Sequence, residues 1–159
     1  MRALSPLRAG PNVRRVDPTS PPPLLAIEYR IGPDAAAVRL LRGQVRALLQ
    51  DHGFAASKVE AALLGLDEVV MNACWHGDAA RQMEPVELAV QVHADALVLE
   101  VRDRGAFVAR DGHAKDGAAL PDDDAESGRG LFLIHATMDE ATFTPREGGG
   151  TVVRLVKRR

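Results

Sequence analysis

The chain has 159 residues, 46% of them hydrophobic, which is enough for one domain with a single core. Its 20 basic and 22 acidic residues leave a net charge of -2, so the charge balance points to no nucleic-acid partner and no anionic membrane surface. One cysteine, Cys74, excludes an internal disulfide and fits a reducing compartment. Because no run of 18 apolar residues is present, we expect a soluble, cytoplasmic protein.

The first 23 residues are rich in arginine and proline and lack the continuous apolar stretch of a secretory signal. They offer little apolar surface to offset the entropy of ordering, and proline removes backbone donors. We therefore expect a disordered tail over residues 1–23 and a folded domain over residues 24–159.

The domain begins with a strand and two helices. Residues 24–31 are apolar and β-favouring and end at a Gly-Pro pair, so they are predicted to form a strand. A helix then begins at about Asp34, with apolar residues at helical spacing, and ends at Gly53. Ser57 and Glu60 have the spacing of a capping box, which predicts that a second helix starts at about Ser57. That helix is apolar almost all round in its second half, so we expect it to be buried.

A hairpin and a long loop follow. Residues 85–93 and 97–103 alternate apolar and polar side chains across a short link, which predicts two antiparallel strands. Residues 104–127 hold glycine, aspartate and alanine with few large apolar groups, and their length is unusual for a passive connection. We expect a mobile, functional loop.

Residues 128–139 return to helical spacing, and residues 141–144 and 151–156 are predicted to form a closing hairpin. The order of elements predicts an α/β fold. Its architecture would be a two-layer sandwich, in which helices cover one face of a mixed, mainly antiparallel sheet.

Glu68 and Asn72 are the first candidate functional residues. They are four residues apart, so they emerge on one face of the second helix, whereas Asp67 points about 100° away. The Asn72 amide oxygen is a ligand type that suits magnesium, and Glu68 would be placed to deprotonate a hydroxyl that attacks phosphorus. The alternative is that both side chains simply face solvent.

Two glycine-containing segments are further candidates. Asp103 ends a strand and precedes Gly105, so its carboxylate could accept a hydrogen bond from an exocyclic amine such as that of adenine. Gly128 and Gly130 precede a helix and could expose backbone amides to an anion. An ordinary turn and a glycine at a helix start are the respective alternatives, and no Walker-type spacing is present.

Taken together, these motifs resemble the histidine-kinase-like ATPase superfamily with the Bergerat fold, and most closely its anti-sigma-factor serine/threonine kinase branch. The resemblance covers roughly residues 24–158. It is carried by LDEVVMNACWHG (66–77), VRDRG (101–105), SGRGLFLIHATMDE (127–140) and GGGTVVRLVK (148–157), in the order of the family's motifs.

The resemblance implies a role for each matching residue. Glu68 would be the general base, Asn72 the magnesium ligand, and Asp103 the residue that reads the adenine amine. Gly105 would shape the adenine site, residues 106–127 would form the ATP lid, and the remaining nucleotide-binding residues would be Gly128, Arg129, Gly130 and Thr151.

The resemblance also implies ATP and Mg²⁺ as cofactors, a sigma factor and a STAS-type anti-anti-sigma protein as partners, and a homodimer. One departure lies in the first glycine box, where Gly105 is followed by a segment one residue shorter than usual. An alternative is therefore a partner-binding module of the same fold with weak or no nucleotide turnover. A phosphorelay ATPase is a third hypothesis, but the chain has no room for a phosphoacceptor helix pair.

Overall fold

A computed structural model of the chain describes residues 21–75, 85–105 and 126–159, and of residues 126–128 it describes the backbone alone. Nearly all of the predicted tail, most of the predicted lid and the end of the second predicted helix therefore lie outside the described residues. Three helices and five strands occur in the described part of the chain: β1 (Leu25–Ile31), α1 (Ala35–Asp51), α2 (Ala56–Trp75), β2 (Val86–Val92), β3 (Ala96–Arg102), α3 (Glu126–Thr137), β4 (Glu140–Pro145) and β5 (Thr151–Arg158).

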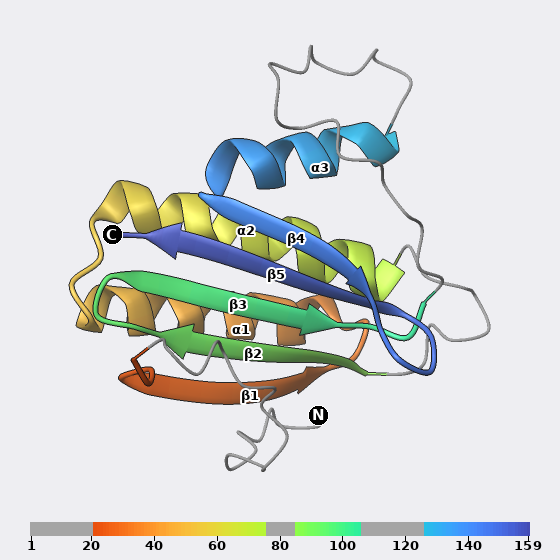
Figure 1. Cartoon of the computed structure of the whole chain (residues 1–159), viewed down its shortest axis with the longest axis horizontal. Helices are drawn as coiled ribbons and strands as arrows, with labels where there is room; N and C mark the ends of the chain where they lie inside the picture. Colours follow the sequence, from red (N-terminus) through yellow and green to blue (C-terminus); the bar gives the residue numbers. More distant parts are fainter. Residues whose placement is uncertain (1–20, 76–84, 106–125) are drawn as a thin grey trace.

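The five strands form one sheet in the order β1-β2-β3-β5-β4. Each of the four strand pairs is antiparallel, so the prediction of a mixed sheet is corrected: the described strands include no parallel pair. Strand β4 lies at the edge because the chain crosses from β3 through α3 and then returns along β5 (Figure 1). The α/β sandwich with helices on one sheet face is confirmed.

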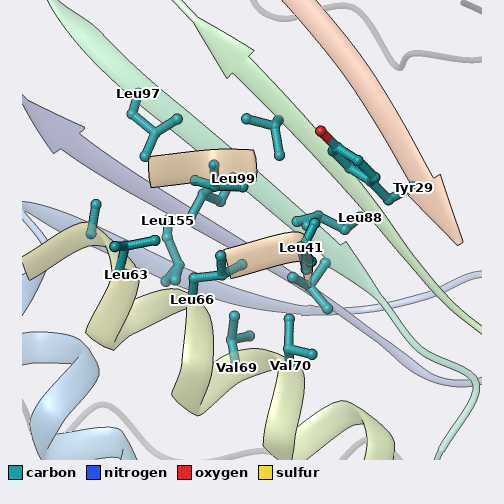
Figure 2. Close-up of a cluster of buried hydrophobic side chains, with 14 of the residues drawn as sticks. Tyr29, Leu41, Leu63, Leu66, Val69, Val70, Leu88, Leu97, Leu99 and Leu155 are labelled. Atoms are coloured by element: carbon teal, nitrogen blue, oxygen red, sulfur yellow. The ribbon is translucent and has the colours of Figure 1, made fainter. Parts of the chain in front are cut away.

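The core lies between the helices and the sheet. Alternate strand residues such as Leu88 of β2 and Leu99 of β3 point toward the helices, as the period of two predicts. They meet Leu41 of α1 and Leu66 of α2 (Figure 2). Helix α2 is central to the packing, because it contacts the other two helices and also β2, β3 and β5. Within the described ranges, the helices are too short or too polar to cross a membrane.

The limits of α1 follow from local chemistry. The Asp34 side chain accepts a hydrogen bond of 2.8 Å from the Ala36 amide and so caps the helix, which begins where the sequence predicted. After the last turn, Gly53 adopts a φ of 74°, a left-handed conformation that glycine takes at little cost. The same residues that signal this helix in the sequence therefore begin and end it.

The start of α2 differs from the prediction. The helix begins at Ala56, and the Ala55 carbonyl accepts the first helical hydrogen bonds, so Ser57 lies inside the first turn. The predicted capping box is wrong because the Glu60 carboxylate accepts hydrogen bonds from Arg46 of α1. A tertiary ion pair has replaced the local cap. Further along α2, burial of Cys74 raises the pKa of its thiol to about 11, which fits a packing role.

Candidate functional site

The middle of α2 carries the two polar residues expected to share a face. Glu68 and Asn72 are both half-buried, and both lie against Gly130 of α3. A Cβ atom at position 130 would lie 2.8 Å from Glu68 Oε2 and 3.5 Å from Asn72 Nδ2. Two helices can approach this closely only where one of them lacks a side chain. The structure thus brings Glu68, Asn72 and Gly130 together.

Asp67, the neighbour of Glu68, faces a different helix. Its Oδ2 lies 2.9 Å from Arg42 Nε of α1. Burial raises the pKa of Asp67, and the positive charge of Arg42 opposes that rise. Asp67 therefore belongs to the packing between α1 and α2, while Glu68 remains directed toward α3.

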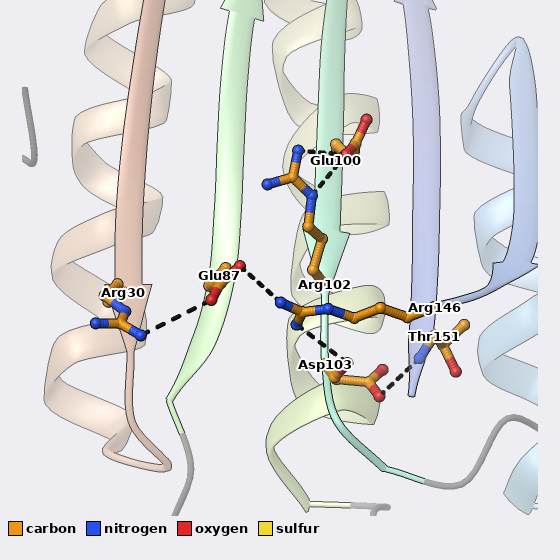
Figure 3. Close-up of polar contacts among 7 residues, drawn as sticks. All are labelled: Arg30, Glu87, Glu100, Arg102, Asp103, Arg146 and Thr151. Atoms are coloured by element: carbon orange, nitrogen blue, oxygen red, sulfur yellow. Dashed lines mark hydrogen bonds and ion pairs between the residues drawn. The ribbon is translucent and has the colours of Figure 1, made fainter. Parts of the chain in front are cut away.

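Asp103 directly follows β3 and is anchored at both its backbone and its side chain. Its N–H donates to the Thr151 carbonyl over 3.0 Å. Its Oδ1 accepts a hydrogen bond from the Gly105 amide at 2.8 Å. The same oxygen accepts from the Thr151 amide at 3.2 Å (Figure 3). Within the described part of the chain, both of these side-chain hydrogen bonds go to Oδ1 and none goes to Oδ2.

The electrostatic setting of Asp103 follows from these contacts. Burial raises the pKa of its carboxyl group, because desolvation disfavours the charged form. The amides of Gly105 and Thr151 and the charge of Arg146 act in the opposite direction. The carboxylate is therefore partly desolvated and has several donors and one cation near it.

The turn between β4 and β5 closes against Asp103. Gly150 has a φ of 108°, and a Cβ atom there would lie 2.1 Å from the Asp103 carbonyl oxygen and 2.7 Å from Arg104 Cα. These are backbone atoms that cannot rotate aside, so any other residue would displace the turn. Gly150 therefore permits the approach that places Thr151 beside Asp103.

The start of α3 requires a correction. The sequence places Gly128 and Gly130 at the beginning of a helix, but the helix begins two residues earlier, at Glu126. Since only the first-turn amides of a helix lack intrahelical acceptors, Gly128 can still offer its amide to an anion, whereas Gly130 lies deeper in the helix. Glycine at position 130 allows α3 to pack this closely on Glu68. Arg129 is exposed.

The separate pieces lie at one end of the molecule. Figure 1 shows that α2 and β3 end, and β5 starts, at the same end of the molecule, on the right of the view. Residues 76–84 and 106–125, which connect to these pieces, lie outside the described residues. Sequence reasoning missed Arg146, which donates to the Asp103 carbonyl, and Glu87, which accepts from Arg146. The only feature of the sequence that could have pointed to Arg146 is its place just before the three glycines of residues 148–150.

Residues 31–157 match the family model described as "Histidine kinase-like ATPase domain". The chain belongs to the histidine kinase-like ATPase family. This match covers most of the chain and includes every predicted site residue.

Curated relatives and a solved structure agree with the family. The domain is 27% identical over 132 residues to proteins named serine-protein kinase RsbW from Staphylococcus aureus strains RF122 and MRSA252. That match covers 79% of this chain and 82% of each relative. A crystal structure of the RsbU and RsbW domains of Rv1364c from Mycobacterium tuberculosis has the same fold, with a TM-score of 0.60 and 20% identity. It covers 84% of this chain, which spans about a third of that longer protein (32%).

Proposed function

We propose that this histidine kinase-like ATPase domain is a Mg-ATP-dependent protein serine/threonine kinase that acts as an anti-sigma factor. The observation that carries the proposal is the closeness of Gly130 to both Glu68 and Asn72, because it places a carboxylate and an amide together against the first half of α3. The family match and the serine-protein kinase names of the relatives support the same activity.

The residues present suit a nucleotide with its magnesium ion. Asp103 would accept a hydrogen bond from the adenine amine through Oδ2, while the Gly105 and Thr151 amides hold its Oδ1. Because Gly130 has no side chain, the backbone of α3 lies close to both Glu68 and Asn72, and a Cβ atom there would collide with the Glu68 carboxylate. Asn72 would hold Mg²⁺ through its amide oxygen, with water and phosphate as the other ligands. Gly128 and Arg129 would border the phosphates from the start of α3.

In the transfer itself, Glu68 acts as the general base. It accepts the proton of the attacking serine or threonine hydroxyl as the new oxygen–phosphorus bond forms and the bond to the β-phosphate oxygen breaks, which releases ADP. Bound Mg²⁺ supplies positive charge that stabilises the phosphoryl oxygens. Asp103 and Thr151 would hold the adenine end of the nucleotide. The triphosphate would extend from there and place the γ-phosphoryl group beside Glu68.

We further propose the partners that this activity requires. The phosphorylated protein would be a STAS-type anti-anti-sigma factor, and a sigma factor would be sequestered when that protein is unavailable. A homodimer in the cytoplasm is the form in which we expect the domain to act.

The proposal is tested with two variants of the full chain. In the presence of magnesium, ATP at one hundred times its dissociation constant should raise the free energy of unfolding of the wild type by about 2.7 kcal/mol. This stabilisation is measured as a rise in melting temperature. Asn72→Ala should lose this magnesium-dependent rise. Glu68→Gln should keep it, yet fail to transfer labelled γ-phosphate to STAS-type proteins from the same genome.

Each result has a defined meaning. Unchanged transfer by Glu68→Gln would contradict the role of the base. Tight complexes with a sigma factor or STAS-type protein, without any transfer by the wild type, would favour the non-catalytic binding module. The shortened segment after Gly105 is the feature of the sequence that makes this second outcome worth testing.

A further inference from the structure

An alternating chain of charges crosses the sheet where β3 ends. Arg30 Nη2 of β1 lies 3.8 Å from Glu87 Oε1 of β2, and the other oxygen of Glu87 accepts from Arg146 Nη2 at 3.3 Å. The second terminal nitrogen of Arg146, Nη1, donates to the Asp103 carbonyl over 3.5 Å (Figure 3). Arg146 thus reaches from the β4–β5 turn to β2 and contacts the end of β3 on the way.

Glu87 pairs with Arg146 and not with the arginine that lies opposite it in the sheet. In the ladder between β2 and β3, Arg102 is the residue directly opposite Glu87. Arg102 binds Glu100 of its own strand instead, with Nε at 2.7 Å and Nη2 at 2.6 Å from Oε1. The side chains of Arg146 and Glu87 are 22% and 28% exposed, so their pair is better shielded from water than an ordinary surface ion pair.

The backbone of Arg146 also helps to hold the turn that lies against Asp103. Its N–H donates to the Gly150 carbonyl at 2.9 Å, and its carbonyl accepts from the Gly149 amide at 3.1 Å. These bonds close the turn that sets Gly150 against the Asp103 carbonyl. The carbonyl oxygen of Asp103 is therefore contacted by the Arg146 guanidinium group and by the turn that Arg146 closes.

We propose that Arg146, held by Glu87, is a positioning residue that fixes the strand end carrying Asp103, and thereby sets the preference of the site for a purine with a 6-amino group. This inference rests on the proposed function, in which Asp103 reads the adenine amine. Arg146 does not touch the base in this scheme. It acts by keeping the Asp103 carboxylate in place and by supplying a positive charge near it.

The test compares two ligands that differ by one amine. Calorimetry on the full chain measures dissociation constants for the magnesium complexes of ATP and of purine riboside triphosphate, which lacks the 6-amino group. The wild type should prefer ATP by about tenfold, the usual size of one hydrogen bond to a charged group. Arg146→Met should reduce this ratio toward one by weakening ATP alone, and Arg146→Lys should restore part of it.

Two further variants separate positioning from general damage. Arg102→Met removes another arginine–glutamate pair from the same sheet end and should keep the wild-type ratio. Glu87→Gln should lower the ratio in the wild type and have no further effect in Arg146→Met, because it acts through Arg146.

The outcomes distinguish this inference from the proposed function. A wild-type ratio retained by Arg146→Met overturns the inference, even if both ligands bind more weakly, because equal weakening reports structural damage. If the wild type binds neither triphosphate, the proposed function fails and the inference fails with it. If the wild type binds both equally, Asp103 does not read the amine, and Arg146 has no selectivity to set.

Discussion

At the scale of single residues, Gly130 shows how a missing side chain can build a site. An alanine there would meet Glu68 Oε2 at 2.8 Å, but this oxygen is the far end of a flexible side chain and can move away. The backbone need not shift. The cost of the substitution would therefore fall on the orientation of Glu68 rather than on the fold.

If Glu68 is the base proposed above, Gly130→Ala should lower the rate of phosphate transfer by about 10- to 100-fold, because displacing a catalytic group by about 1 Å has an effect of that size. The free energy of unfolding should change by less than about 1 kcal/mol, since alanine favours helix and the displaced carboxylate can relocate. Transfer of labelled γ-phosphate and urea unfolding measure the two quantities.

Gly43→Ala is the matched control for this prediction. Gly43 lies in α1, and a Cβ atom there meets nothing within 4 Å. This variant should gain up to about 1 kcal/mol of stability and keep wild-type transfer. If Gly130→Ala and Gly43→Ala both transferred phosphate at the wild-type rate, the close approach of α3 to Glu68 would have no catalytic meaning.

Residues that act through local spacing could be predicted from the sequence, and residues that act across the sheet could not. The four-residue spacing of Glu68 and Asn72 fixes a shared helix face whatever the rest of the fold does. The contacts of Arg146 depend on sheet order, because Glu87 is 59 positions away and two strands distant. No local pattern records that pairing.

At the scale of elements, Asp139 joins the end of α3 to the end of β5. Its carboxylate accepts from the Arg158 amide at 2.6 Å and from Lys157 Nζ at 3.3 Å. Partial burial raises the pKa of Asp139, but these hydrogen bonds and the nearby positive charges outweigh it and leave the pKa below its ordinary value of 3.8. The ionised form is therefore favoured in the folded protein.

We predict that Asp139→Asn lowers the free energy of unfolding by about 1 kcal/mol at pH 7, the net size of one such hydrogen-bonded contact at an exposed site. Because the folded pKa lies below the unfolded one, the contribution of Asp139 is complete above pH 3.8 and is lost as the pH falls through the folded value. The difference between wild type and variant should shrink over that acidic range. Urea unfolding between pH 7 and pH 3 measures it.

Glu140→Gln serves as the control for the effect of charge. Glu140 pairs with the Arg158 side chain, but both side chains are well exposed, so this variant should cost less than about 0.5 kcal/mol at any pH. A difference for Asp139→Asn that stayed constant from pH 7 to pH 3 would show that its packing, and not its charge, matters.

The helix boundaries show where sequence reasoning about elements is limited. Asp34 and Gly53 mark α1 correctly because their effects are local to the backbone. Ser57 and Glu60 have an equally clear local pattern, yet Glu60 binds Arg46 because α1 brings a guanidinium group within reach. Packing decided that boundary, and packing is not visible along the chain.

At the scale of the whole molecule, α2 links the site to the core. One side of this helix carries Glu68 and Asn72 beside α3, and another side packs Leu66 into the cluster between helices and sheet. The position of the face that carries Glu68 and Asn72 is therefore set by the same burial that stabilises the domain. Leu64, two residues before Leu66, turns away from the core and is 37% exposed, whereas Leu66 is 1% exposed.

This difference predicts unequal costs for the same truncation in the same helix. Leu66→Ala should lower the free energy of unfolding by about 2–5 kcal/mol, because it leaves a cavity in a packed core. Leu64→Ala should cost less than about 1 kcal/mol, since its surroundings can close or fill with water. Urea unfolding, followed by circular dichroism and by the fluorescence of Trp75, should give coincident transitions if one cooperative unit unfolds. Equal costs for the two variants would mean that α2 does not anchor the site through the core.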